Sequence, residues 1–492
     1  MTVKGGSLRK SAQQAILWSA GLNLFRDVLQ FGQMLILVRL LDPAIYGMAG
    51  LATTFINFIG LMSFQHIITH VLQVRGEGKV NYHQHFTAGI VLNGGLFVLA
   101  NLIAFALQYS EQYAPLQPLL HLLSLSFLLS VPVDMRVKML ERDHNWSRLR
   151  ILQMGGIIVS ITSGIAMALA GAGVYALIVP GLLASLVFVA DLFLHMGWRP
   201  HWQWSYAEYR EALHFGFNRA GSNALNGGRT LLQNTMITQQ LQFSSLGVFG
   251  RAEGLANMFC GRIAQEVSNA LYPIITRTDA QSERFQRISS LVLQSVAWVV
   301  IPIAVFFSLE AENIVKLLFG RKWLEVIPLL PPAMAIGVAI SIGATAYRLL
   351  LANNQSRLCL RADLVSFALV VIAVLTLIPF GLVSYLIGAT VVHMLIAVIL
   401  VALLVRTNGL KIISLAVVLL PPFLSVFVAA VAVWSLKALL LGELQPVIQL
   451  LLAGCAFAVA YVAVLRLFFR LPLTELVSYL PGGKSLGRVL CL

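Results

Sequence analysis

The sequence predicts an all-α polytopic membrane protein with about fourteen transmembrane helices, in two parallel six-helix lobes plus two extra C-terminal helices. Three observations predict this fold class. Of the 492 residues, 58% are hydrophobic and only 11% are charged, which is about half the charge of an average soluble protein. Apolar stretches of about 20 residues, long enough to cross a bilayer, recur along the whole chain. In addition, a segment near the start of the chain is repeated near its middle.

The apolar stretches define the expected helices in chain order. These ranges are 12–38, 44–73, 84–108, 116–139, 151–170, 173–196, 211–240, 246–275, 289–309, 325–352, 361–379, 382–404, 412–438 and 445–468. We therefore predict four parts: an N-terminal lobe at 1–205, a C-terminal lobe at 206–410, an extra helix pair at 411–470 and a cytoplasmic tail at 471–492.

The distribution of basic residues predicts the orientation of these helices. If the N-terminus is cytoplasmic and the spans alternate, 23 of the 34 Lys and Arg residues lie on the cytoplasmic side and 5 lie outside. Such a bias is typical of bacterial inner-membrane proteins, whose cytoplasmic loops are basic. Both termini are then cytoplasmic. The bias also explains the net charge of +14 without a nucleic-acid partner.

The internal repeat relates the first helix to the seventh. Residues 22–30 read LNLFRDVLQ, and residues 225–233, which lie 203 positions later, read LNGGRTLLQ. Both segments start a block of six helices, and both blocks start on the cytoplasmic side. The repeat therefore predicts two parallel lobes related by an axis along the membrane normal, with a substrate site between them.

Each copy of the repeat carries a polar stripe. On the first helix the stripe consists of Asn23, Arg26, Gln30 and Gln33, spaced by three, four and three positions. On the seventh helix it consists of Arg219, Ser222, Asn226, Arg229 and Gln233. Each set shares one helix face, which we expect to turn away from lipid toward a central cavity.

The arginines of the two stripes indicate an anionic ligand. Arg26 and Arg229 would face each other across the cavity, where guanidinium groups match phosphate oxygens. Arg219 would lie about 15 Å closer to the cytoplasm, at the cavity mouth.

Asp27 and two histidines complete the set of candidate residues. Adjacent side chains on a helix point about 100° apart, so Arg26 and Asp27 are not expected to face each other. Asp27 is a candidate for ion coupling, and pairing with a neighbouring cation is the open alternative. His66 and His70 have a metal-binding spacing, but without a third ligand nearby no metal site is expected.

Three short motifs resemble those of one transporter family. They are LVRLLDPAIYGMAGL at 37–51, NALYPIITR at 269–277 and LLFGRKWLEVIPLL at 317–330. They are similar to turns and helix ends of Wzx-type polysaccharide flippases, in the polysaccharide-transport branch of the MOP superfamily. The resemblance reaches about residue 410. The last two helices match only in hydropathy, so packing on the bundle, lipid binding and contact with a polymerase all stay open for them.

The resemblance implies a flippase of the bacterial inner membrane that works by alternating access. Its substrate would be an undecaprenyl-pyrophosphate-linked oligosaccharide for exopolysaccharide, capsule or O-antigen. The headgroup would cross through the cationic cavity while the lipid tail stays in the bilayer. No cofactor is implied. The energy source stays open among the membrane potential, protons, sodium and a substrate gradient, and direct use of ATP is not expected because the sequence has no ATP-binding motif. A polysaccharide polymerase and export machinery are candidate partners.

Three other functions compete with this one. A glycosyltransferase or polymerase would place acids in a large outer loop, whereas the first outer loop is short and carries only Asp42. A cation-coupled multidrug exporter of the same superfamily would favour acidic linings, and facing arginines would repel its substrates. A peptidoglycan-precursor flippase would share the cationic cavity, and only the polysaccharide-type turns argue against it.

Overall fold

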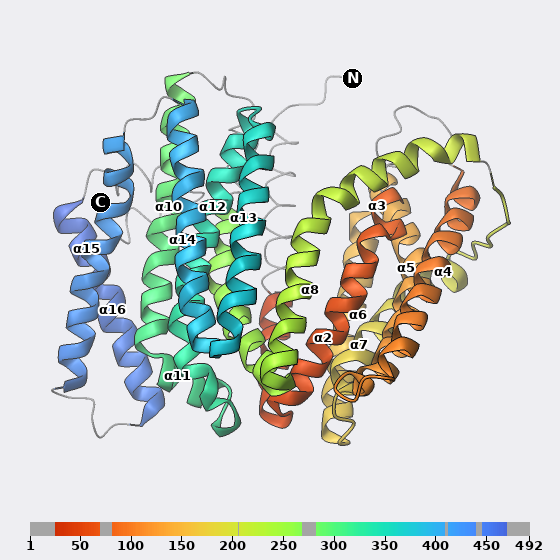
Figure 1. Ribbon diagram of the computed structural model, residues 1–492, viewed down its shortest axis with the longest axis horizontal. Helices are drawn as coiled ribbons and strands as arrows, with labels where there is room; N and C mark the ends of the chain where they lie inside the picture. Colours follow the sequence, from red (N-terminus) through yellow and green to blue (C-terminus); the bar gives the residue numbers. More distant parts are fainter. Residues whose placement is uncertain are drawn as a thin grey trace. The chain divides into compact units, whose positions relative to one another are not determined.

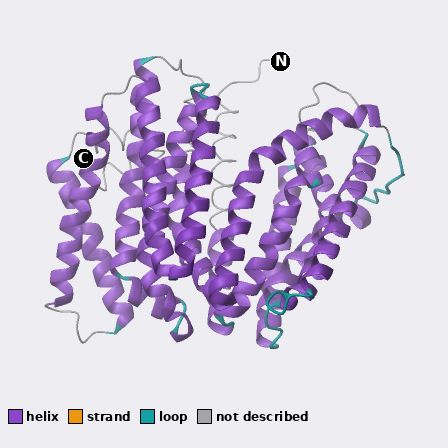
Figure 2. Ribbon diagram, viewed as in Figure 1, coloured by secondary structure: helices purple, strands orange, loops and turns teal. Residues whose placement is uncertain are grey.

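A computed structural model describes the backbone of residues 25–68, 81–204, 206–267, 282–408, 412–438 and 445–469. Within these ranges the side chains of residues 66–67, 206–223, 284, 408 and 412–419 are outside the description. Every element in the described ranges is a helix, a turn or a loop (Figure 2). The described part of the chain therefore confirms the predicted all-α class.

The helices follow the predicted spans in order (Figure 1). Residues 25–40 are helical. They are followed by α2 (Pro43–Ile59), α3 (Phe64–Ile68), α4 (Tyr82–Leu107), α5 (Gln117–Arg142), α6 (Trp146–Leu169), α7 (Tyr175–Ala190), α8 (Tyr206–Ala256), α10 (Glu283–Leu309), α11 (Ala311–Leu318), α12 (Leu330–Ala352), α13 (Ser356–Leu377), α14 (Leu382–Asn408), α15 (Ile412–Leu436) and α16 (Pro446–Phe468). Within the described residues the predicted spans coincide with these helices in order: the second span covers α2 and α3, and α8 covers the seventh span and the start of the eighth. Residues 12–24, 69–73 and 268–275 of the first, second and eighth spans lie outside the described residues.

Ten helices within the described residues are long and apolar enough to cross a membrane. A shorter apolar helix, Leu420–Leu436, forms most of α15. These apolar helices make the protein a multi-pass membrane protein. The spans are helical because a helix satisfies the backbone polar groups of a lipid-exposed segment internally.

Side-chain caps decide where several helices begin. The Asn145 side chain accepts a hydrogen bond from the Arg148 backbone nitrogen at 3.2 Å, and Ser282 accepts one from Phe285 at 3.1 Å. Such caps satisfy N–H groups that the first turn of a helix leaves open. The cap at Asn145 places Arg148 and Arg150 on α6, whereas the predicted span at 151–170 had assigned both to a cytoplasmic loop.

Helix α8 bends at Gln242, whose φ of 73° lies in the left-handed region. This bend takes the place of the loop predicted between helices seven and eight. Next to the bend, α8 touches α2 backbone to backbone. A Cβ atom on Gly47 would stand 1.8 Å from the Phe243 carbonyl oxygen, and one on Gly247 would stand 1.9 Å from that of Pro43. Glycine at both positions therefore permits the crossing.

The chain divides into two compact units, Met1–Gly247 and Val248–Leu492. In the first unit α4 packs on α5, α6 packs on α7, and α7 packs on α5. In the second unit α12 packs on both α10 and α14, and α13 packs on α14. The part of α8 up to Gly247 belongs to the first unit, whereas the repeat assigns it to the second lobe. The lobe boundary at 205/206 stays a prediction.

Helices α15 and α16 pack on the second unit. Helix α15 lies along α10, and the Tyr461 hydroxyl of α16 donates a hydrogen bond to the Trp298 carbonyl oxygen of α10 at 2.7 Å. Beyond the end of α15, Lys437 forms an ion pair of 2.7 Å with the buried Glu310 at the end of α10. These contacts support the first of the three roles left open for the C-terminal pair, which is packing on the bundle.

Candidate functional site

The N-terminal unit contains a cavity of about 390 Å³, a size within the usual range for ligand sites. Residues of the first described helix (25–40), α5, α6 and α7 line it. Its polar lining consists of Arg26, Gln30, Gln33, Arg150, Gln153, Ser160 and Ser185. None of the described residues that line this cavity is a carboxylate.

The polar stripe of the first described helix faces this cavity. Arg26, Gln30 and Gln33 all line it. The Gln33 amide nitrogen donates a hydrogen bond to the Ser160 carbonyl oxygen of α6 at 3.3 Å. Gly164 leaves room for this contact, because a Cβ atom there would stand 2.8 Å from the same amide nitrogen. The first described helix and α6 therefore lie against each other on one side of the cavity.

Arg26 and Asp27 form an ion pair, contrary to the expectation from the sequence. Arg26 Nε and Nη2 lie 3.0 and 2.9 Å from Asp27 Oδ1. The directions of the two Cβ atoms do diverge on the helix, but the long arginine side chain bends back along the surface to reach its neighbour. The expectation failed because it considered only the start of each side chain.

The other predicted site residues are not among those lining this cavity. Asn226 is exposed, and Arg229 and Gln233 are partly exposed, on α8. Their part of α8 packs against α2, where the Asn234 side chain donates a hydrogen bond to Thr54 Oγ1 at 2.9 Å. Asn23 and the side chain of Arg219 fall outside the described residues, as do the side chains of His66 and His70. The facing of Arg26 and Arg229 stays a prediction.

Arg150, Gln153 and Ser160 are cavity residues that the sequence reading missed. Together with Ile157 they are spaced by three, four and three positions, the same spacing as the stripe on the first helix. This spacing was a usable signal. The expected span begins at residue 151 and so leaves Arg150 in a loop, and the apolar Ile157 interrupts the polar pattern.

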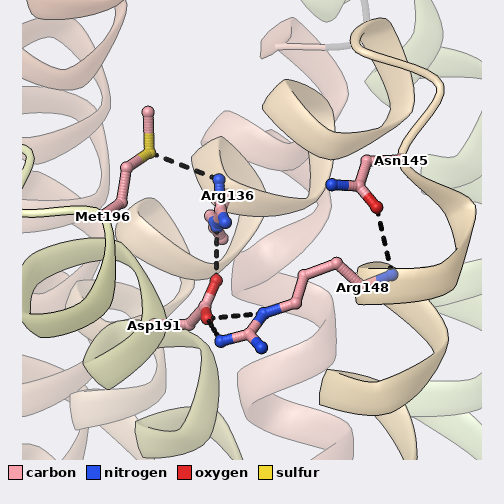
Figure 3. Close-up of polar contacts among 5 residues, drawn as sticks. All are labelled: Arg136, Asn145, Arg148, Asp191 and Met196. Atoms are coloured by element: carbon pink, nitrogen blue, oxygen red, sulfur yellow. Dashed lines mark hydrogen bonds and ion pairs between the residues drawn. The ribbon is translucent and has the colours of Figure 1, made fainter.

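A second group of charged residues is joined by hydrogen bonds and ion pairs (Figure 3). Arg136 of α5 donates a hydrogen bond from Nε to Asp191 Oδ2 at 2.6 Å, and Arg148 of α6 donates one from Nε to Asp191 Oδ1 at 2.9 Å. Arg136 Nη1 also contacts the Met196 sulfur at 3.3 Å. Arg136 and Asp191 are buried, with 7% and 4% of their surfaces exposed. We call Arg136, Arg148 and Asp191 the ion cluster.

The ion cluster ties three of the cavity-lining helices together. Arg136 is one turn beyond the lining residue Val133 on α5, and Asp191 is one turn beyond the lining residue Phe188 at the end of α7. Two arginines share one carboxylate, so the cluster keeps an excess of positive charge beside a cavity whose own ionisable lining residues are arginines. Such a site suits an anionic ligand that also has hydroxyl groups, because the amides and serines can exchange hydrogen bonds with them.

Comparison with known proteins places the chain in a family. A family model described as "Polysaccharide biosynthesis protein" matches residues 36–328, which is more than half of the chain. The chain belongs to the polysaccharide biosynthesis protein family. The match includes Arg150, Gln153 and the ion cluster, and it begins after Arg26 and Gln33.

Relatives of this polysaccharide biosynthesis protein have related names. It is 23% identical over 359 residues, covering 71% of each chain, to the "Lipopolysaccharide biosynthesis protein WzxC" of Escherichia coli (strain K12). It is 23% identical over 327 residues, covering 65% of each chain, to the "Succinoglycan biosynthesis transport protein ExoT" of Rhizobium meliloti (strain 1021). These findings confirm the resemblance to Wzx-type proteins.

Solved structures establish the fold of this polysaccharide biosynthesis protein. The lipid II flippase MurJ in an inward closed conformation superposes with a TM-score of 0.72 at 14% identity, covering 92% of this chain and 99% of that one. An inward-facing multidrug resistance MATE family transporter of the MOP superfamily superposes with a TM-score of 0.59 at 16% identity, covering 78% and 95%. The predicted polytopic fold is thereby confirmed.

Proposed function

We propose that this polysaccharide biosynthesis protein translocates an undecaprenyl-pyrophosphate-linked oligosaccharide across the membrane. The observation that carries the proposal is the cavity of the N-terminal unit, with two arginines, three glutamines, two serines and no carboxylate among its lining residues. Arginine suits the pyrophosphate, and the amides and hydroxyls suit the sugar. The names of WzxC and ExoT support a substrate from polysaccharide synthesis.

The proposed mechanism is alternating access, and the proposed role is that of a transporter, not an enzyme. The headgroup enters from the cytoplasmic leaflet of the inner membrane and leaves toward the outer leaflet, while the polyprenyl tail stays in lipid. Burying a pyrophosphate in a membrane protein is costly unless cations and hydrogen-bond donors replace its water, and the arginines supply both. A polysaccharide polymerase and export machinery are the proposed partners on the outer side.

The two competing transport functions fit less well. A multidrug exporter for organic cations would require the cavity to attract positive charge, and its ionisable lining residues are Arg26 and Arg150. A peptidoglycan-precursor flippase has a similar headgroup, and the MurJ-like fold suits it. The names of the sequence relatives favour the polysaccharide substrate.

The energy source that we propose is an ion gradient or the membrane potential. Asp27 is the candidate coupling residue on the first described helix. Its ion pair with Arg26 means that a change in its charge would alter the arginine beside it. This makes Asp27→Asn the informative variant, with transport compared across a range of imposed proton and sodium gradients.

The decisive experiment measures the sidedness of lipid-linked oligosaccharide in membrane vesicles from cells depleted of this protein. We expect the intermediate to be trapped in the cytoplasmic leaflet. Wild-type protein should restore its translocation to the outer leaflet, whereas the Arg26→Ala and Arg229→Ala variants should not. Lysine at either position should retain more transport than alanine, because the charge persists although the planar fork is lost. Sidedness that is unchanged by depletion would overturn the proposed function.

A further inference from the structure

We infer that the phosphate-binding site of the substrate lies inside the N-terminal unit, where Arg150 of α6 joins Arg26 in holding the pyrophosphate. This inference rests on the proposed function and names the residues of its site. It adds Arg150, which the sequence repeat does not predict, to the phosphate-binding site. It holds whether or not Arg229 also binds the phosphate.

The register between two helices places the arginines together. Gln33 of the first described helix contacts the carbonyl oxygen of Ser160 on α6. On both helices the lining residues extend back from this contact, to Arg26 on one and to Arg150 on the other, and only Ile161 follows it, so the helices run in the same direction. Seven residues before Gln33 is Arg26, and seven residues before Ser160 is Gln153. Both are two turns, about 10.5 Å, from the contact.

Arg26 and Arg150 therefore lie at the same end of the cavity. Arg150 is one turn before Gln153, and its Nη1 donates a hydrogen bond to the Gln153 side-chain oxygen at 3.2 Å. Arg26 is held by Asp27 through Nε and Nη2. A guanidinium has five N–H donors, so a carboxylate oxygen on one edge of Arg26 leaves other donors for a phosphate.

The charges around this end of the cavity favour a multivalent anion. Both ionisable lining residues are cations, and the Asp27 carboxylate beside Arg26 balances only one of them. The ion cluster, which lies one turn away on α5 and α7 and includes Arg148 of α6, contributes two arginines against one carboxylate. Two arginines such as Arg26 and Arg150 attract an anion more strongly inside a protein than in water, because the local dielectric constant is lower.

The same geometry orients the ligand. With the pyrophosphate between Arg26 and Arg150, the cavity continues for two helical turns toward Gln33 and Ser160. Neutral amide and hydroxyl groups dominate the polar lining there. The first sugar residues would occupy this part, where they can exchange hydrogen bonds with the amide groups without competing with the phosphate for cations.

The test measures binding of undecaprenyl pyrophosphate to the full-length protein in nanodiscs of neutral phosphatidylcholine. Undecaprenol serves as the uncharged probe, and discs with added phosphatidylglycerol test whether an ordinary anionic headgroup competes. We expect wild type to prefer the pyrophosphate. Arg150→Gln and Arg26→Gln should each weaken binding about 10- to 100-fold, the effect of losing a hydrogen bond to a charged group. Arg150→Lys should lose less.

Arg361→Gln is the matched control. Arg361 occupies the second turn of α13, as Arg150 does of α6, but it is exposed and does not line the cavity. Arg361→Gln changes the net charge by the same amount as Arg150→Gln, and it should leave the binding of undecaprenyl pyrophosphate unchanged. In the double variant Arg26→Gln/Arg150→Gln, the loss should differ from the product of the two single losses, because both residues hold one ligand.

The outcomes separate the inference from the proposed function. If wild type binds the pyrophosphate but Arg150→Gln, folded as judged by its melting temperature, binds like Arg361→Gln, the inference is wrong and the proposed function stands. If the double variant shows independent losses, the two arginines do not share a ligand and the inference is also wrong. If wild type prefers phosphatidylglycerol or shows no preference for the pyrophosphate, the site belongs to ordinary lipid and both fail.

Discussion

Arg136 and Asp191 form a buried ion pair of 2.6 Å between residues 55 positions apart in the chain. We predict that Asp191→Asn destabilises the protein by about 3–5 kcal/mol, because Arg136 is left as a buried charge without its carboxylate. The apparent melting temperature of purified protein, followed by circular dichroism in detergent, checks this.

Glu141→Gln is the control for Asp191→Asn. Glu141 lies at the same end of α5 as Arg136 and pairs with Lys138 at a partly exposed site, so this variant also removes one carboxylate. A loss of at most about 1 kcal/mol is expected there. If Asp191→Asn melts at the same temperature as Glu141→Gln, the ion cluster does not hold α5, α6 and α7 together.

The ion pair between Lys437 and Glu310 gives a second stability prediction. Glu310 is fully buried and Lys437 is partly exposed. Lys437→Ala should destabilise the protein by about 1–3 kcal/mol, because it leaves a buried carboxylate without its cation. The measurement is again the melting temperature. Unchanged stability would show that α15 is not anchored to α10 by this contact.

Lys316→Ala removes the same charge from an exposed pair and serves as the control. The hydrogen bond and charge of Lys316 lower the pKa of the exposed Glu312. A lowered pKa in the folded state means that this small contribution is present near neutral pH and is lost as the pH falls through the folded pKa. At pH 7 the variant should differ from wild type by no more than about 1 kcal/mol.

The crossing of α2 and α8 predicts a strong difference between two glycines of α2. Gly47→Ala should prevent normal packing, because the new Cβ atom would meet the Phe243 carbonyl oxygen at 1.8 Å and backbone cannot rotate away. Gly50→Ala, three residues later, meets nothing within 4 Å and should behave as wild type. The yield of monodisperse protein and its melting temperature distinguish the two variants. Equal yields and equal melting temperatures of the two variants would contradict the close crossing of α2 and α8.

Gly164 should tolerate a small side chain but not a large one. In Gly164→Ala the Cβ atom meets the movable end of Gln33 at 2.8 Å and Pro180 at 3.3 Å, so a small shift suffices. Gly164→Leu should force the first described helix away from α6 and reduce transport in the vesicle assay. Gly181→Leu on α7, where a Cβ atom meets nothing within 4 Å, is the control. Normal transport by Gly164→Leu would argue against this helix contact.

Much of the fold was predictable because the bilayer acts on each segment separately. A span must be about 20 residues long and apolar, so hydropathy located the long helices of the described part without reference to their neighbours. It did not locate the eight-residue α11, which lies between two predicted spans. The spacing of Arg26, Gln30 and Gln33 likewise predicted a shared face, since helix geometry depends on only a few consecutive residues. The structure places all three on one cavity.

The errors arose where a side chain is placed by something other than its position along a helix. The expected divergence of Arg26 and Asp27 ignored the reach of a long flexible side chain. The 23 basic residues expected on the cytoplasmic side include Arg136 and Arg148, and in the structure both of these hold Asp191. A count of charges cannot distinguish a solvated arginine from a paired one.

The sequence by itself determined the membrane class, the order of the helices and the polar face of the first one, because these depend on local length, composition and spacing. Only the tertiary structure decided that Arg150 and Gln153 lie on the same cavity as Arg26, and that Asp191 binds two arginines from other helices. The physical reason is that a contact between helices depends on how their surfaces pack, and on glycines such as Gly164 that let them approach. No local pattern in either helix specifies that arrangement.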